Sequence, residues 1–351
     1  MSPPRDFPRK LDLRHGCIEM QHGGGGRAMA QLVEELFVAA FANPALSALN
    51  DQAVLDAGLA GRLVIATDSH VVSPLFFPGG DIGSLAVHGT VNDVAMAAAE
   101  PRWLAASFIL EEGFALAELA RIVDSMAQAA RAAGVAIVTG DTKVVEAGKG
   151  DGVFITTTGV GVARAGFETG GTRARPGDVV LVSGAIGDHG IAIMACREGL
   201  DFDVPIESDS AALHELVGAL CAVLPPPALR VLRDPTRGGL GATLNEIARA
   251  SGVGMQLAET AIPVHEPVRA ACEFLGLDPL YVANEGKLIA IVDPDHAEAA
   301  LAALRAHPLG REAARIGVCT DDGQRFVELE TGFGGRRVID WIAGEQLPRI
   351  C

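Results

Sequence analysis

The sequence of 351 residues has few aromatic side chains and too little positive charge to balance its negative charge. Aromatic residues make up 5%, and 28 Lys and Arg stand against 44 Asp and Glu, so the formal net charge is −16. Nucleic-acid-binding surfaces are recognised by clustered Lys and Arg, and no basic stripe runs through this sequence. The charge balance argues against nucleic acid and against an anionic membrane surface as partners.

Long apolar runs and closely paired cysteines are also missing. No run reaches the about 18–20 apolar residues of a membrane-spanning helix. The first 14 residues are proline-rich and charged and lack the apolar stretch of a secretory signal. None of the six cysteines forms a C-x-x-C pair, which would indicate structural zinc. We therefore expect a cytoplasmic protein with reduced thiols and no membrane partner.

The composition is otherwise that of a folded protein, with 49% hydrophobic and 21% charged residues. A chain of this length favours two domains. Gly, Thr, Arg and Pro cluster at residues 166–177, between two regions of alternating strand and helix patterns. We expect an N-terminal α+β domain over 1–170, a C-terminal α/β domain over 171–330 and a mobile tail over 331–351.

Five aspartates of the first region lie next to predicted buried strands or helices. Each could be a helix cap, but clustered carboxylates raise one another's pKa unless a cation lies between them. Oxygen ligands suit Mg²⁺, which usually holds substrate phosphates. The five are Asp51, Asp68, Asp81, Asp93 and Asp141.

Four consecutive glycines, Gly23 to Gly26, precede a predicted helix over residues 28–41. Such a run is too flexible for a helix or strand interior. It could be a mobile linker, or a loop whose amides approach a phosphate, and the following helix N-terminus favours the second reading. Neither the P-loop pattern G-x-x-x-x-G-K-[ST] nor a strand followed by G-x-G-x-x-G is present. The sequence thus indicates an unconventional nucleotide site.

The final residue is a cysteine, Cys351, which follows a segment that begins with three closely spaced glycines. Chain ends are usually disordered, so the residue could be a frayed end without a role. It could also be a thiol on a tether. The tail alone does not decide between these readings.

Six segments together resemble the HypE family of hydrogenase maturation proteins, the carbamoyl dehydratases. The resemblance runs from about residue 16 to the end of the chain. A wider superfamily, with aminoimidazole ribonucleotide synthetase, selenophosphate synthetase and thiamine-monophosphate kinase, shares the Asp-Ser, Asn-Asp and Gly-Asp-Thr elements, whereas the terminal cysteine is particular to HypE. The six segments are residues 77–83, 88–96, 139–145, 183–190, 233–239 and 348–351.

The resemblance implies a two-domain aminoimidazole ribonucleotide synthetase-like fold. The N-terminal sheet would pair with its copy in a homodimer, with ATP near that interface, and the tail would be flexible. It also implies a reaction: a carbamoyl group on the Cys351 thiol is phosphorylated by ATP on its oxygen and loses phosphate, which leaves a thiocyanate. The implied partners are the carbamoyltransferase HypF and the HypC–HypD complex, which accepts the cyanide for the nickel–iron centre.

The resemblance also assigns the site residues. Cys351, Lys143 and Glu285 would be catalytic, with Glu285 favoured as base and an electrostatic role left open for Lys143. His88 and His189 are expected to be structural. The expected Mg²⁺ ligands are Asp51, Asp68, Asp93, Asp141 and Asp234. The expected nucleotide contacts are Gly23, Gly24, Gly25, Gly26, Asp81, Asn92 and Thr142.

Two other functions remain open at this point. A small-molecule kinase or synthetase of the same superfamily would use the same magnesium site on a free substrate and ignore the tail. A carrier would pass its tail between partner proteins without chemistry.

Overall fold

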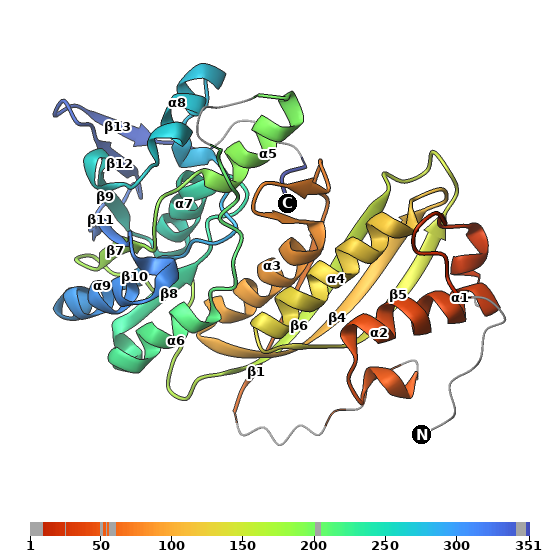
Figure 1. Cartoon of the computed structure of the whole chain (residues 1–351). Helices are drawn as coiled ribbons and strands as arrows, with labels where there is room; N and C mark the ends of the chain where they lie inside the picture. The colour runs from red at the N-terminus through yellow and green to blue at the C-terminus, as the bar shows by residue number, and fades with distance from the viewer. Residues whose placement is uncertain are drawn as a thin grey trace.

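The computed structural model describes residues 10–24, 26–49, 52, 53, 55, 61–200, 205–341 and 349–351. They form two domains, each built on its own sheet, with the C-terminus between them (Figure 1). Within these ranges, no helix is long and apolar enough to cross a membrane.

The first domain is built on a four-stranded sheet in the order β1-β6-β4-β5. β4 and β5 are parallel, and the other two pairs are antiparallel. Helices α3 and α4 lie across one face of this sheet (Figure 1). The elements are β1 (Leu63–His70), α3 (Ile82–Met96), β4 (Ala99–Glu111), α4 (Leu116–Ala132), β5 (Ala136–Val145) and β6 (Val153–Ala163), with a small hairpin of β2 (Phe76–Phe77) and β3 (Gly80–Asp81) before α3.

The two faces of this sheet differ in burial. On the face toward the helices, Leu104, Phe108 and Ile155 are at most 2% exposed and belong to the domain core. On the other face, Leu63 and Ile65 remain 59% and 68% exposed. Side chains of a strand alternate between faces, so one face is packed by the chain itself and the other offers apolar surface to solvent.

The second domain is built on a seven-stranded mixed sheet in the order β13-β12-β9-β11-β7-β10-β8. Helices pack on both faces: Leu181 of β7 belongs to the core beneath α6 and α9, and its neighbour Val180 to the core beneath α7. The elements are β7 (Val179–Val182), α5 (Asp188–Glu198), α6 (His214–Val223), β8 (Leu229–Arg233), α7 (Gly239–Ser251), β9 (Gly254–Ala258), α8 (Glu266–Leu275), β10 (Ile289–Val292), α9 (Ala297–Ala306), β11 (Ala314–Thr320), β12 (Val327–Glu330) and β13 (Arg336–Ile339).

One expectation about local structure is wrong. The mobile tail was expected to begin at residue 331, yet β13 pairs with β12 and so extends the second sheet to Ile339. The predicted helix over residues 28–41 is confirmed as α1 (Arg27–Leu32), a π-helical turn (Val33–Val38) and α2 (Ala39–Phe41).

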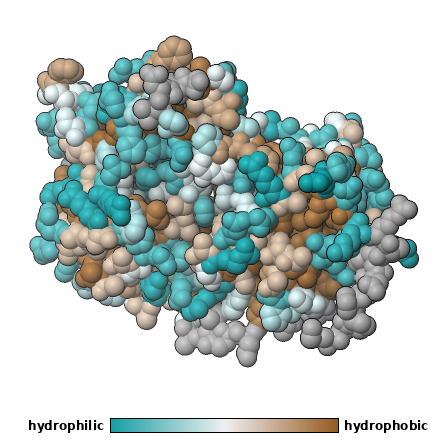
Figure 2. Space-filling view, viewed as in Figure 1, coloured by the Kyte–Doolittle hydropathy of each residue, from teal (hydrophilic) through white to brown (hydrophobic). Residues whose placement is uncertain are grey.

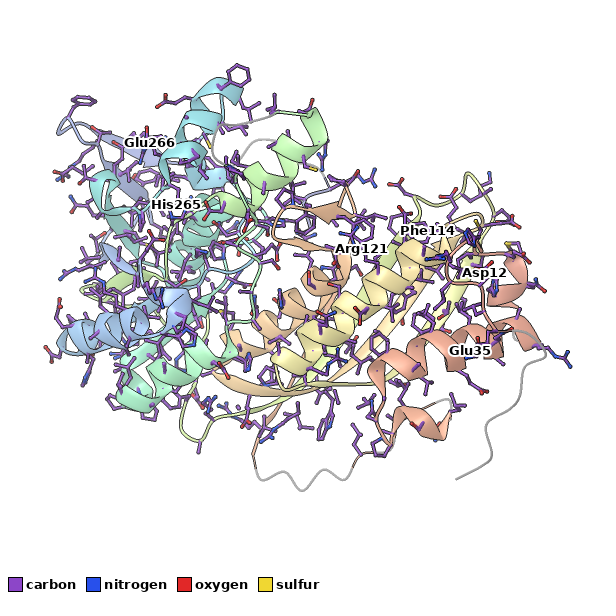
Figure 3. All side chains as sticks on the ribbon, in the orientation of Figure 1. Asp12, Glu35, Phe114, Arg121, His265 and Glu266 are labelled. Carbon is purple, nitrogen blue, oxygen red and sulfur yellow. The ribbon has the colours of Figure 1, made fainter. Side chains whose placement is uncertain are left out.

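The described N-terminal segment belongs to the first domain. The Leu11 N–H donates to Glu35 Oε2 at 2.6 Å. The Ile18 N–H donates to the Phe114 carbonyl at 2.8 Å, which places this segment beside the start of α4 (Figure 3). On the surface in Figure 2, hydrophobic residues gather over the helices of the first domain, among hydrophilic ones. The contacts of the N-terminal segment fix the start of the chain near the β5 edge of the sheet, where α1 begins.

Candidate active site

Three of the predicted aspartates come together between the domains. Asp68 ends β1 and faces α3, because a Cβ placed on Gly89 would lie 3.5 Å from Asp68 Oδ2. Asp93 lies on α3, and Asp234 follows β8. Burial, and then the charges of Asp234 and Asp68, raise the pKa of Asp93 to about 7. Burial also raises the pKa of Asp234, with a smaller effect from Asp68.

This cluster fits a hard cation in its chemistry. Carboxylate oxygens are the ligands that Mg²⁺ prefers, and mutual repulsion of the kind seen at Asp93 is relieved by a bound cation. Among the residues that the structure describes, however, no three His, Cys, Asp or Glu side chains form a ready-made metal cluster. The predicted ligand Asp51 lies outside the described residues.

Glu285 lies next to these aspartates, in the turn before β10. It is 4% exposed, and burial, followed by the charges of Asp234 and Asp209, raises its pKa well above the ordinary value. Its Oε1 is buried without a hydrogen-bond partner in the described part of the chain. Its backbone N–H donates to Asp209 Oδ1 at 3.0 Å. Burial makes such a carboxylate a stronger base than an exposed one.

The terminal thiol is brought to this carboxyl. The Cys351 thiol lies near enough to the Glu285 carboxyl for each group to shift the pKa of the other. Burial, and then the nearby Glu285 charge, raises the pKa of the thiol, so it is protonated in this position. The Val71 N–H donates to the Cys351 carbonyl oxygen at 3.1 Å. The structure therefore unites two of the three predicted catalytic residues.

The other predicted catalytic residue lies elsewhere. Lys143 pairs with Asp141 at 3.5 Å on β5, and their side chains are 66% and 54% exposed. β5 and β1 are opposite edges of the four-stranded sheet, about 14 Å apart at three strand spacings. Asp141 is paired with Ser107 in register and faces the uncovered side, whereas Asp68 faces α3. Within one chain, Asp141 and Lys143 do not join Glu285.

Several predicted nucleotide contacts gather beside β5. A Cβ on Gly23 would lie 2.8 Å from the Val144 nitrogen, so the glycine is required for the chain to approach β5 this closely. Gly24 caps the 3-10 turn Met20–Gly23, Gly26 caps α1, and Gly25 lies outside the described residues. Thr142 lines a pocket of about 500 Å³ between β5 and the helix α1–α2.

The walls of this pocket are mostly apolar, with Met29, Val33, Phe37 and Phe108 among them. The sequence predicted the glycines and Thr142 as nucleotide contacts, but it did not predict the apolar residues that line the pocket. The helical spacing of Met29, Val33 and Phe37 is the only signal, and it is equally typical of an ordinary core helix.

Asp81 has a structural role. Its side chain caps α3, because Oδ1 accepts the backbone N–H groups of Gly83 at 2.7 Å and Ser84 at 3.1 Å. Ser84 Oγ lies 3.1 Å from the Asp81 backbone nitrogen, which completes a capping box. The contacts of this carboxylate are thus those of the helix cap that the sequence left as an alternative.

Asn92 supports the site from behind. Its amide nitrogen donates to the carbonyls of Ala211 at 3.0 Å and Glu285 at 3.2 Å, and its Oδ1 accepts from the Leu213 N–H at 2.7 Å. The predicted nucleotide contact therefore holds the Glu285 turn against α3 in this structure.

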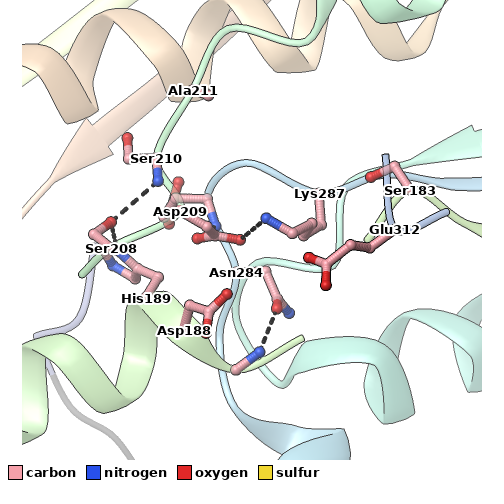
Figure 4. A network of polar contacts seen from close by, with 12 residues as sticks. Ser183, Asp188, His189, Ser208, Asp209, Ser210, Ala211, Asn284, Lys287 and Glu312 are labelled. Carbon is pink, nitrogen blue, oxygen red and sulfur yellow. Dashed lines mark hydrogen bonds and ion pairs between the residues drawn. The ribbon is translucent and has the colours of Figure 1, made fainter. Parts of the chain in front are cut away.

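A polar segment over residues 207–211 was missed from the sequence (Figure 4). Asp209 pairs with Lys287 at 3.0 Å, with both side chains buried. Ser210 Oγ lies 3.0 Å from His88 Nδ1, and burial lowers the pKa of His88 to about 4. His88 thus has the structural role expected for it. The only signal for this segment was a run of small polar residues before α6.

Comparison with known proteins identifies the family. Residues 49–163 and 175–330 match the N-terminal and C-terminal domains of AIR synthase related protein. The chain is 69% identical to "Carbamoyl dehydratase HypE" of Azotobacter vinelandii over 97% of this chain and 99% of that protein. The chain belongs to the carbamoyl dehydratase HypE family.

Solved HypE structures share this fold. "Hydrogenase Maturation Protein HypE in complex with ATP" superposes with a TM-score of 0.90 at 54% identity, covering 95% of this chain and 99% of that one. The "HypE-HypF complex" gives 0.78 at 49% identity, covering 89% and 99%. The predicted HypE resemblance and the two-domain aminoimidazole ribonucleotide synthetase-like α+β fold are confirmed.

Proposed function

We propose that this member of the HypE family uses ATP to dehydrate a carbamoyl group carried on its own Cys351, and so supplies the cyanide ligand of nickel–iron hydrogenase. The observation that carries this proposal is the position of the Cys351 thiol beside the buried Glu285 carboxyl. A substrate sulfur held by its own chain needs no separate binding site. Positioning of this kind supplies much of an enzymatic rate.

The chemistry follows from the group on the sulfur. The oxygen of S–C(=O)–NH₂ is a poor leaving group, so it first takes the γ-phosphoryl group of ATP and gives ADP. The nitrogen loses one proton as the oxygen is phosphorylated and a second as phosphate leaves, which gives S–C≡N. A base beside the sulfur-bound carbon is therefore required twice.

Glu285 is our candidate for this base. Its raised pKa makes the carboxylate a stronger base than an exposed one, and its unpartnered Oε1 is in place to accept a proton. The raised thiol pKa in the docked position makes Cys351 a poor nucleophile there. We therefore assign activation of the thiol toward the carbamoyl donor to a partner's site.

We propose that the adenine ring of ATP enters the apolar pocket lined by Thr142, with Gly23, Gly24 and Gly26 near the phosphates. Asp68, Asp93 and Asp234 would hold Mg²⁺. When bound, Mg²⁺ neutralises charge on the transferred phosphoryl group. Asp51, Asp141 and Gly25 remain predicted members of this site.

We further propose a homodimer in which the uncovered faces of the two first-domain sheets meet. The exposed Leu63 and Ile65 support this proposal, because exposed apolar sheet faces mark interaction surfaces. Asp141 and Lys143 face that side, so a second copy would carry them toward the site of its partner. A monomeric mass by light scattering at micromolar concentration would refute it.

The proposed partners are HypF as carbamoyl donor and the HypC–HypD complex as cyanide acceptor. A HypE relative has been crystallised with HypF, which supports the first. We also propose a cytoplasmic location, which the free state of all six cysteines supports.

The test follows the mass of the C-terminal peptide. Carbamoylated protein with Mg-ATP should lose one water from that peptide, and Cys351→Ala should form no thiocyanate while still binding ATP. Cys17→Ala, at an exposed free thiol, is the matched control. Phosphorylation of a free small molecule by Cys351→Ala at the wild-type rate would instead favour the kinase or synthetase.

A further inference from the structure

The last three residues are held by contacts that the proposed reaction does not use. Ser73 N–H donates to the Arg349 carbonyl at 3.2 Å and Val71 N–H to the Cys351 carbonyl at 3.1 Å, so the tripeptide lies along residues 71–73. Between them, Ile350 is 3% exposed and belongs to the core of the first domain. The thiol therefore lies at the end of a segment anchored at each of its residues.

Two side chains of α5 bind the carbonyls of this segment. His189 Nε2 lies 2.9 Å from the Ile350 carbonyl oxygen. Arg197 Nη2 donates to the Arg349 carbonyl at 2.8 Å and to the Ser73 carbonyl at 2.8 Å, and its Nε donates to Ser73 at 3.0 Å. The planar guanidinium thus bridges the tail and the segment of residues 71–73 that it follows, which a flexible ammonium would do poorly.

A hydrogen-bond chain fixes which nitrogen of His189 donates. Ser208 Oγ accepts the Ser210 N–H at 3.1 Å and lies 2.7 Å from His189 Nδ1 (Figure 4). The Ile350 carbonyl can only accept, so Nε2 of the neutral ring carries the proton and donates to it, and Nδ1 accepts from the Ser208 hydroxyl. Burial lowers the pKa of His189, which keeps this neutral form.

We propose that Arg197 and His189 are positioning residues of a latch that grips the carbonyls of residues 349 and 350 and so sets the Cys351 sulfur against Glu285. Because both residues bind main-chain oxygens, the latch works whether the sulfur is free or carries a carbamoyl group. Its release exposes the thiol to the carbamoyl donor. The consequence for catalysis rests on the function proposed above, but the latch itself does not.

The latch is tested first without any catalysis. Alkylation of Cys351 by iodoacetamide is followed by mass spectrometry of the C-terminal peptide in the full-length protein. Loss of hydrogen bonds from a charged group should speed alkylation about tenfold in Arg197→Gln. Arg197→Lys should be intermediate, since it keeps the charge but loses the fork. Arg269→Gln, at a half-exposed arginine of α8, should match wild type.

A second variant keeps the test valid if Arg197→Gln does not fold. Ile350→Ser removes the buried side chain of the tripeptide without touching α5 and should also speed alkylation, with an unchanged thermal midpoint. Wild-type alkylation rates in both Arg197→Gln and Ile350→Ser would overturn the latch.

The catalytic consequence is measured on carbamoylated protein with Mg-ATP. Arg197→Gln should lose water from the tail about tenfold more slowly than wild type, whereas its carbamoylation by HypF should not slow. If wild type itself loses no water, the proposed function fails, and the alkylation rates still decide the latch. Equal water loss and equal alkylation in wild type and Arg197→Gln would overturn the latch alone.

Discussion

Two groups of polar residues that were predicted to belong to one site have opposite environments in this protein. The inner group, Asp93, Asp234 and Glu285, is largely buried, and burial raises the pKa of each carboxyl. The outer pair, Asp141 and Lys143, lies in solvent at the far edge of the same domain's sheet. The difference shows that burial, rather than the motif, decides which carboxylates can take part in proton transfer.

The same comparison separates the part of the site that one chain forms from the part that needs a second copy of the chain. Glu285 of the inner group already interacts with the Cys351 thiol. The outer pair lies on the uncovered apolar face of the sheet. Water screens the charges of the pair unless a second copy of the chain covers that face. Our predictions are ways to test this separation.

The largest effect is expected from Glu285→Gln. Loss of a general base should slow thiocyanate formation by about 10²–10⁴-fold, followed by mass spectrometry of the carbamoylated tail. Lys143→Gln should cost less if its role is electrostatic, and Glu298→Gln, at an exposed site on α9, should cost nothing. A greater loss in Lys143→Gln than in Glu285→Gln would make the outer residue the base.

Mixed dimers test whether the two groups meet across an interface. Each of Lys143→Ala and Glu285→Gln should be slower than wild type when it is the only variant present. When the two variants are dissociated, mixed in equal amounts and allowed to reassociate, half of the dimers are hybrids. If Lys143 acts on the partner's Glu285, each hybrid holds one intact site. Activity should then recover to about a quarter of wild type. No recovery, in hybrids verified by mass, would place both residues in one chain.

A smaller effect concerns stability without metal. The pKa of Asp93 rises from 3.8 to about 7 on folding, so the native state binds the extra proton and stability is lost as pH rises from about 4 to about 7. Asp93→Asn should therefore stabilise the protein by about 4 kcal/mol at pH 8 in a chelator, and not at pH 4.

Asp141→Asn is the matched control for this effect. As a surface change it should stay within about 0.5 kcal/mol at both pH values in urea unfolding. Equal responses of Asp93→Asn and Asp141→Asn would remove the distinction between the two groups.

The smallest effect concerns His88. Its pKa falls from 6.5 to about 4 on folding, so the unfolded chain binds the extra proton and stability is lost as pH falls from about 6.5 to about 4. In His88→Gln, this slope should be smaller by about 1.4 kcal/mol per pH unit. The exposed His15→Gln should leave the slope unchanged, and an unaltered slope in His88→Gln would contradict burial of a neutral imidazole.

Prediction from the sequence succeeded for features set by local pattern. The helix that carries Asn92 and Asp93 and the strand that carries Asp68 lie where periodicity placed them, because the burial of one face fixes the spacing of apolar residues. Prediction from the sequence was incomplete where distant segments meet. Asn92 is a predicted nucleotide contact, and only the structure shows that it also holds the Glu285 turn, 193 residues away in sequence.

The sequence alone determined the family, the two-domain fold and the terminal cysteine as the special residue, since these depend on residue identities and their order. Tertiary structure decided the rest. Strand order placed Asp68 and Asp141 on opposite edges, and packing between domains buried Glu285. Docking along residues 71–73 showed that the end of the chain is anchored by His189 and Arg197, because hydrogen bonds between segments so far apart in sequence leave no local pattern.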